Sequence, residues 1–117
     1  SLLQAQSTAH IGNYSYDIVH DVWVCSSMLD QIFGLNAHSL KNMSTWVDLV
    51  IPEHRNMVQN HFSEAMETHS EFRFDYQIRR KSDAKVRWVM GIGTFSYADD
   101  GRALSLEGVI QDIIERK

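Results

Sequence analysis

The stretch FRFDYQIR, residues 72–79, decides the fold class, because its apolar and polar side chains alternate without a break. A period of two sends successive side chains to opposite faces of a β-strand, so this segment predicts a strand with one buried face. The apolar members of the alternation are Phe72, Phe74, Tyr76 and Ile78. We expect this face to lie against helices.

Two more strands are predicted after this stretch. A polar turn at 81–85 leads to a long strand over 86–97, and an Asp-Asp-Gly turn at 99–101 leads to a last strand over 103–114. Apolar residues occupy both parities of these two strands, which suggests that the second face of the sheet is also covered. The N-terminal segment or a partner subunit would supply that cover.

Helices are predicted ahead of residue 72. Pro52 opens a helical pattern over 53–67, since proline is tolerated in a first helical turn, and a short helix is predicted over 28–33. Residues 34–45 are predicted as a loop, and residues 11–25 alternate as a hairpin. Hairpin-linked strands with the helices inserted as one block predict an antiparallel α+β domain.

Composition is typical of one compact domain and narrows the function classes. The chain has 117 residues with 44% hydrophobic residues and a formal net charge of −4, so it lacks the basic excess of a nucleic-acid-binding domain. The single cysteine, Cys25, excludes an internal disulfide and fits a reducing compartment. No apolar run reaches the roughly 20 residues of a membrane span, so no membrane contact by this segment is expected. The chain begins Ser-Leu-Leu without an initiator methionine, and we expect a segment of a longer protein.

Several short segments together resemble a PAS domain, including its C-terminal PAC motif. They cover residues 8–117 in the family's order and spacing: IGNY at 11–14, IFG at 32–34, IPEHR at 51–55, YQIRRK at 76–81, RWV at 87–89 and LEGVIQDIIERK at 106–117. The resemblance implies a five-stranded antiparallel sheet of strand order 2-1-5-4-3 with helices packed on one face. This sequence departs from the family at Ala84, where the family has glycine, so we expect a turn type that avoids positive φ. It also departs at Ile114, which replaces a threonine.

The resemblance implies a domain organisation and a cellular role. Residues 1–9 would form an N-terminal capping or linker helix, 10–114 the sensory domain, and 115–117 the start of a signalling linker. The domain itself would be non-catalytic and cytoplasmic, within a multidomain bacterial signal-transduction protein whose membrane anchoring is left open. A covalently linked sensor histidine kinase of a two-component system is the first expectation for the output domain, and a diguanylate cyclase the next.

A pocket for a small, mostly apolar ligand of unknown identity is expected between sheet and helices, although the same residues suit a plain core. Candidate lining residues are Phe33, Trp46, Phe62, Met66, Phe74, Tyr76, Met90 and Ile92. The signal would leave through the last strand at Asp112, Ile114 and Glu115.

Known cofactors and metal ions are not expected. His54 and His61 stand seven residues apart on one helix, roughly 10 Å along its axis, which is too far to share one ion. Haem-binding relatives use a histidine of this helix, but no basic clamp for propionates is present, so haem is disfavoured. Flavin is disfavoured because Cys25 does not stand in the Asn-Cys-Arg type of motif that the light-sensing relatives carry.

An alternative function remains open, in which the domain binds no ligand and serves as a homodimerisation and relay module. Its interface would lie on the outer face of the sheet, at Leu2, Leu3, Val89, Phe95 and Tyr97. A small cone-shaped α+β enzyme is a remote alternative, because the strand at 72–79 carries no inward-facing acid or histidine. No nucleophile elbow, glycine-rich phosphate loop or His-Glu-x-x-His arrangement is present.

Overall fold

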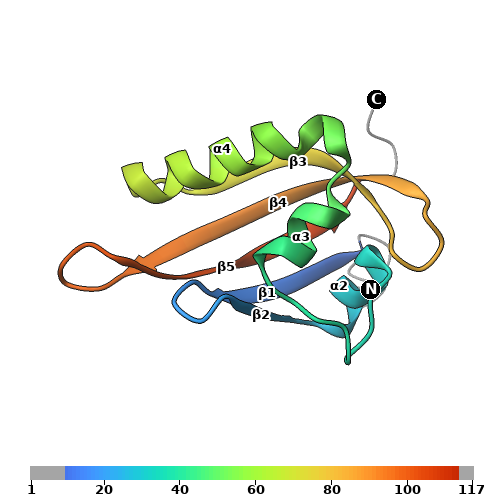
Figure 1. Ribbon diagram of the computed structural model, residues 1–117, viewed down its shortest axis with the longest axis horizontal. Helices are drawn as coiled ribbons and strands as arrows, with labels where there is room; N and C mark the ends of the chain where they lie inside the picture. Colours follow the sequence, from blue (N-terminus) through green and yellow to red (C-terminus); the bar gives the residue numbers. More distant parts are fainter. Residues whose placement is uncertain (1–9, 114–117) are drawn as a thin grey trace, which may run out of the picture.

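A five-stranded antiparallel sheet in the order β2-β1-β5-β4-β3 forms the domain in the computed structural model, which describes residues 10–113 (Figure 1). The strands are β1 (Ile11–Asp17), β2 (Val22–Cys25), β3 (Phe72–Arg79), β4 (Val86–Tyr97) and β5 (Ala103–Asp112). The helices are α2 (Ser27–Phe33), α3 (Met43–Leu49) and α4 (Pro52–Thr68). The expected fold class and strand order are confirmed. The predicted capping helix over 1–9 and linker start over 115–117 lie outside the described residues.

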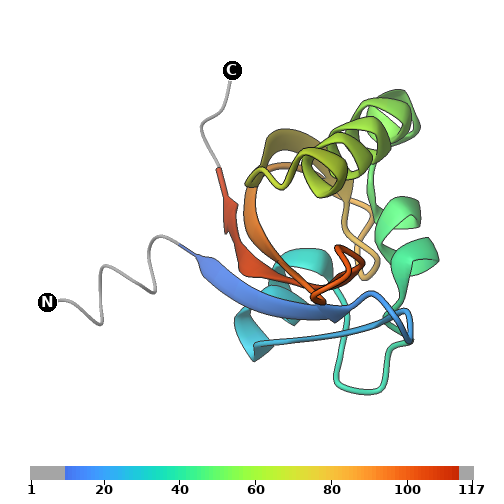
Figure 2. The same cartoon turned by 90° about the vertical axis from the view of Figure 1, so that its left-hand side faces the viewer.

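The three helices pack on one face of the curved sheet, here called the inner face (Figure 2). Leu29 of α2 is fully buried against Gly12 of β1, where a Cβ atom would lie 2.5 Å from the leucine Cβ. Phe62 of α4 packs its ring 5.7 Å from that of Phe72 on β3. The opposite, outer face of the sheet carries no helix among residues 10–113.

β4 faces the other way from the orientation expected. Val89 pairs with the buried Tyr76 and is itself fully buried, and Phe95 pairs with the buried Leu106. Odd-numbered residues of β4 therefore point to the inner face, and Met90 and Ile92 point to the outer face. The sequence pattern could not decide this, because apolar residues occupy both parities of the strand.

α3 begins inside the segment that was predicted as a loop, and that part of the prediction was wrong. The side chain of Asn42 accepts a hydrogen bond from the Thr45 N–H at 2.9 Å and caps the first turn. A helix of only seven residues shows too little periodicity to stand out in the sequence. α3 places the Trp46 ring 6.0 Å from that of Tyr76 on the edge strand β3.

The turn between β3 and β4 also differs from its expectation. Ala84 adopts φ 63°, in the left-handed region that glycine favours. The turn therefore has a positive φ at this position even though the residue is not glycine. Asp83 holds it in place by accepting the Lys85 N–H at 3.0 Å and by pairing with Arg80.

Between residues 10 and 113, no helix is long and apolar enough to cross a membrane.

Candidate functional site

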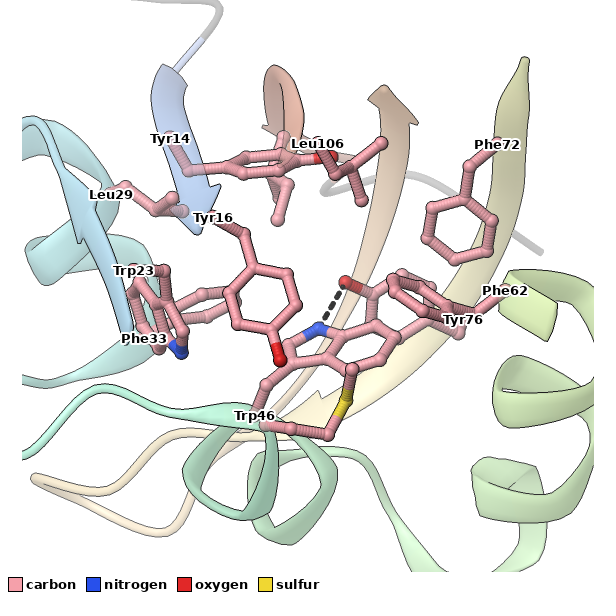
Figure 3. A pocket seen from close by; sticks show the side chains of 12 residues that line it. Tyr14, Tyr16, Trp23, Leu29, Phe33, Trp46, Phe62, Phe72, Tyr76 and Leu106 are labelled. Carbon is pink, nitrogen blue, oxygen red and sulfur yellow. Dashed lines mark hydrogen bonds between the residues drawn. The ribbon is translucent and has the colours of Figure 1, made fainter. Parts of the chain in front are cut away.

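A cavity of about 50 Å³ lies between the inner face of the sheet and the helices (Figure 3). Its walls come from β1 and β5 on one side, from β2 and α2 on a second, and from α3, α4 and β3 on the others. Eight of its twelve lining residues are aromatic. The lining residues are Tyr14, Tyr16, Trp23, Leu29, Phe33, Met43, Trp46, Phe62, Phe72, Tyr76, Leu106 and Ile110.

Trp46 is the central member of the aromatic lining. Its ring centroid lies 6.0 Å from that of Tyr76 at 90° and 6.1 Å from that of Phe72 at 81°. Phe62 of α4 adds a third neighbour at 6.3 Å. Edge-to-face contacts of this kind favour particular angles between rings, so these side chains restrict one another's orientation.

The polar atoms of the lining are phenol and indole groups. The Trp46 Nε1–H donates to the Tyr76 hydroxyl at 3.0 Å, as the dashed line in Figure 3 marks. The Tyr16 hydroxyl donates to the Asp21 carboxylate at 2.7 Å, and the Tyr14 hydroxyl donates to the Ile92 carbonyl at 3.4 Å. Burial raises the pKa of the Tyr14 and Tyr76 phenols far above their usual value, so this space disfavours negative charge.

Two glycines of β4 give the aromatic rings room. A Cβ at Gly93 would lie 2.4 Å from the Tyr14 hydroxyl and 2.6 Å from Leu106, so the phenol occupies the space that a side chain would need. A Cβ at Gly91 would make ordinary contacts at 3.7 Å with Tyr76 and Ile110. The sheet therefore presents bare backbone at its centre, and the rings of other strands cover it.

Comparison with protein families gives a match over most of the chain. A family model described as the PAS fold matches residues 22–110. The chain belongs to the PAS fold family. This PAS domain is also 33% identical over 72 residues to the uncharacterized protein y4lL of Sinorhizobium fredii, a match that covers 62% of this chain and 9% of the relative. The chain thus spans a small part of that protein's length.

Solved structures of low sequence identity share the same fold. A sensory box histidine kinase/response regulator from Burkholderia thailandensis superposes with a TM-score of 0.80 at 21% identity, over 98% of this chain and 86% of that one. The N-terminal domain of a diguanylate cyclase with PAS/PAC sensor from Marinobacter aquaeolei also gives 0.80, at 18% identity, over 89% and 95%. A PAS domain from Colwellia psychrerythraea gives 0.75 at 12% identity, over 99% and 100%.

Half of the pocket residues named from the sequence line the cavity of the PAS domain. These are Phe33, Trp46, Phe62 and Tyr76. Phe74 lies on the inner face but outside the lining, with its ring centroid 4.2 Å from that of His61 and tilted by 35°, and the Met66 carbonyl accepts from the Tyr97 hydroxyl at 2.8 Å. Met90 and Ile92 lie on the outer face, because β4 is reversed from its expected orientation.

The pocket prediction missed both tyrosines of β1 and several aliphatic residues. The missed lining residues are Tyr14, Tyr16, Trp23, Leu29, Met43, Phe72, Leu106 and Ile110. The alternation of β1 puts Tyr14 and Tyr16 on one face, and Phe72 shares the face of Tyr76, so those three could have been found from the period of two. Leu29 and Met43 carry no comparable signal.

Asp112, the predicted point of signal exit, ends β5 in a partly buried ion pair. Its Oδ2 accepts from Arg87 Nη1 at 3.0 Å, and its side chain is 7% exposed. Its Oδ1 is buried and has no hydrogen-bond partner among residues 10–113. Ile114 and Glu115, named with it, lie outside the described residues.

The residues named for a dimer interface do not form an outer surface. Val89 and Phe95 are buried in the core, and the Tyr97 hydroxyl reaches α4. Leu2 and Leu3 lie outside the described residues. The outer face instead exposes apolar side chains from three neighbouring strands: Ile11, Val24 and Val109.

The histidine and cysteine candidates lie in structural contacts. The His54 Nδ1 accepts the Gln77 N–H at 3.0 Å and closes the edge of β3. Cys25 is half-buried, and burial first, followed by a hydrogen bond to Asp30, raises the pKa of its thiol to about 12. Among the residues that the structure describes, no group of three potential metal ligands comes together.

Proposed function

We propose that this PAS domain is a cytoplasmic sensory module that holds a small ligand in its aromatic cavity and passes a conformational change to a linked output domain. The observation that carries the proposal is the cavity of about 50 Å³ whose lining includes eight aromatic side chains. A mostly apolar, aromatic lining with a few polar groups is typical of small-molecule sites. We propose a histidine kinase as the first choice of output domain and a diguanylate cyclase as the second.

The path that we propose for the signal is β5. Two of its residues, Leu106 and Ile110, line the cavity, and the same strand ends at Asp112. A ligand that favours one arrangement of this strand shifts the population of two states by no more than its difference in affinity for them. Because Asp112 is paired with Arg87 of β4, a shift of β5 relative to β4 acts directly on this ion pair.

The alternative is a ligand-free module that dimerises and relays a signal. It is favoured by the exposed apolar patch on the outer face, where Val24 is 63% exposed, Ile11 43% and Val109 37%. Met90 and Ile92 extend the same face on β4. This surface replaces the interface expected from the sequence.

A native mass spectrum and a melting curve of the purified domain separate the two functions. A sensor retains a small molecule or melts at a higher temperature with one, since a ligand that binds only the folded state stabilises it. A relay shows a dimer whose population depends on concentration and no ligand-dependent shift. A monomer without any shift in a broad ligand screen contradicts both.

The exit at Asp112 is tested in the full-length parent protein with Asp112→Ala. We expect the output activity to change much more than the melting temperature does. The control is Glu107→Ala, which removes an exposed acid of the same strand and is expected to leave the output unchanged. If Asp112→Ala lowers output and stability in equal proportion, Asp112 has a structural role only.

A further inference from the structure

We propose that the cavity binds a neutral molecule of about four non-hydrogen atoms that carries one hydrogen-bond acceptor, held by the hydroxyl of Tyr76. This inference rests on the proposed sensory function and names its ligand class. It follows from three properties of the cavity: its size, the chemistry of its lining, and a lining hydroxyl for whose proton residues 10–113 provide no acceptor.

The volume limits the size of the ligand. A cavity of about 50 Å³ is a third of the roughly 150 Å³ that takes up a benzene-sized ligand, so a ligand of no more than about four non-hydrogen atoms fits. A ligand with that number of non-hydrogen atoms binds with a dissociation constant no lower than about 40 µM. Such an affinity suits a sensor of an abundant small metabolite or solvent-like molecule.

The lining excludes charged ligands. None of its twelve residues is acidic, basic or histidine. The Asp21 carboxylate, which contacts the lining at Tyr16, already accepts from the Tyr16 hydroxyl at 2.7 Å and from the Met43 N–H at 2.9 Å. An ion placed here would lose its hydration without gaining a partner of opposite charge.

Tyr76 supplies the free donor. A phenol can both accept and donate, and the Tyr76 hydroxyl accepts from Trp46 at 3.0 Å while no acceptor for its own proton lies among residues 10–113. The hydroxyls of Tyr14 and Tyr16 differ, since both donate to protein oxygens. Tyr76 is 1% exposed, so its proton is shielded from bulk solvent. A ligand with an acceptor atom accepts a hydrogen bond from this hydroxyl. A site of this type rejects an analogue that has no acceptor atom.

Four probes with the same branched skeleton test the proposal: acetone, 2-methylpropene, acetate and trimethylammonium. The readout is NMR titration of the indole N–H signals. Trp23 and Trp46 line the cavity, whereas Trp88 pairs with Gln77 on the outer parity of β4 and serves as an internal control. We expect saturable shifts of Trp23 and Trp46, but not of Trp88, with acetone about tenfold tighter than 2-methylpropene. Acetate and trimethylammonium should give no saturable shift.

Two matched phenol deletions assign the donor. Tyr76→Phe should bring the acetone and 2-methylpropene affinities to within about twofold, and Tyr16→Phe should keep the tenfold ratio. If Tyr76→Phe does not fold, the ratio in the unaltered domain still decides whether a donor is used.

Each contrary result has a different meaning. Tighter binding of acetate or trimethylammonium than of acetone overturns the ligand class and leaves the sensory function standing. Equal binding of acetone and 2-methylpropene overturns the role of Tyr76. If none of the four probes shifts Trp23 or Trp46, even at high millimolar concentration, both the ligand class and the proposed ligand sensing fail.

Discussion

β3 and β4 are neighbours in the sheet, yet only one of them could be oriented from its sequence. The two strands pair residue by residue, from Phe72 opposite Gly93 to Arg79 opposite Val86. β3 has apolar side chains at one parity only, and its inner face was predicted correctly. β4 has them at both parities, and its inner face was assigned in reverse.

The difference teaches that the buried face of a strand is not always its more hydrophobic one. The inner parity of β4 includes Gly91 and Gly93, while the outer parity includes Met90 and Ile92. The glycines face inward because the Tyr14 hydroxyl and Leu106 occupy the space above Gly93. Small residues at the centre of a sheet can thus mark the site where large side chains of other elements gather.

The largest expected difference in stability between the two faces of β4 comes from introducing a charge. Val89→Asp places a carboxylate at a fully buried position, beside Asp112 in the register, and should lower the free energy of unfolding by about 4 kcal/mol. Met90→Asp, on the outer face, should cost about 1 kcal/mol or less. Urea unfolding of both variants checks this. A larger loss at Met90 than at Val89 would restore the orientation expected from the sequence.

Substitutions of Gly91 and Gly93 give the next largest expected difference in the free energy of unfolding. Gly93→Ala should lower the free energy of unfolding by about 2 kcal/mol, because its Cβ would lie 2.4 Å from the Tyr14 hydroxyl. Gly91→Ala, with contacts at 3.7 Å, should be neutral or stabilising by up to about 1 kcal/mol, since glycine weakens a strand interior. Thermal unfolding of the pair measures the gap. Equal stabilities would show that Tyr14 yields easily and that the glycines are not required.

Alkaline titration tests the burial of Tyr76, which faces Val89 across the ladder. Burial raises the pKa of its phenol above the ordinary value of 10.0, an effect that the hydrogen bond from Trp46 only partly opposes. The folded state therefore holds the proton more tightly than the unfolded state. The contribution of this phenol to the free energy of unfolding is fully present below pH 10 and is lost as the pH rises further.

We expect this phenol to account for about 1 kcal/mol of lost stability between pH 10 and pH 11. Tyr76→Phe should show a shallower decline over that range, measured by urea unfolding at fixed pH values. Tyr16 remains in both proteins, so its contribution cancels in the comparison. The pKa of Tyr14 is raised by burial first and by the charge of Tyr76 second, so its contribution changes less than that of Tyr76 itself. Parallel declines in the two proteins would mean that Tyr76 is not shielded from water.

The smallest expected effect is in the turn that joins the two strands. Ala84→Gly should raise the free energy of unfolding by roughly 0.5–1 kcal/mol, because φ 63° is unfavourable for alanine. Ala103→Gly is the control, since Ala103 begins β5 and is not among the residues with positive φ. It should be destabilising by a similar amount. Destabilisation by both variants would show that the turn changes conformation in solution.

The cavity shows how far sequence reasoning reaches for a site. Tyr76 and Phe62 were found because each lies on the apolar side of a clear periodic segment. Trp46 was found as an apolar residue, although the helix that positions it was not predicted. Leu106 and Ile110 were missed because β5, like β4, is apolar at both parities, and its inner face is defined only by its neighbours β1 and β4.

The sequence by itself determined the strands, the long helix, the hairpins and the family. These depend on local properties: the period of the side chains, the proline at a helix start and the residues suited to turns. The tertiary structure alone decided the inner face of β4, the position of α3 and the existence of the cavity. The physical reason is volume, because space above Gly91 and Gly93 is shared by rings from strands and helices far apart in sequence. No local pattern records how such rings fill a common space.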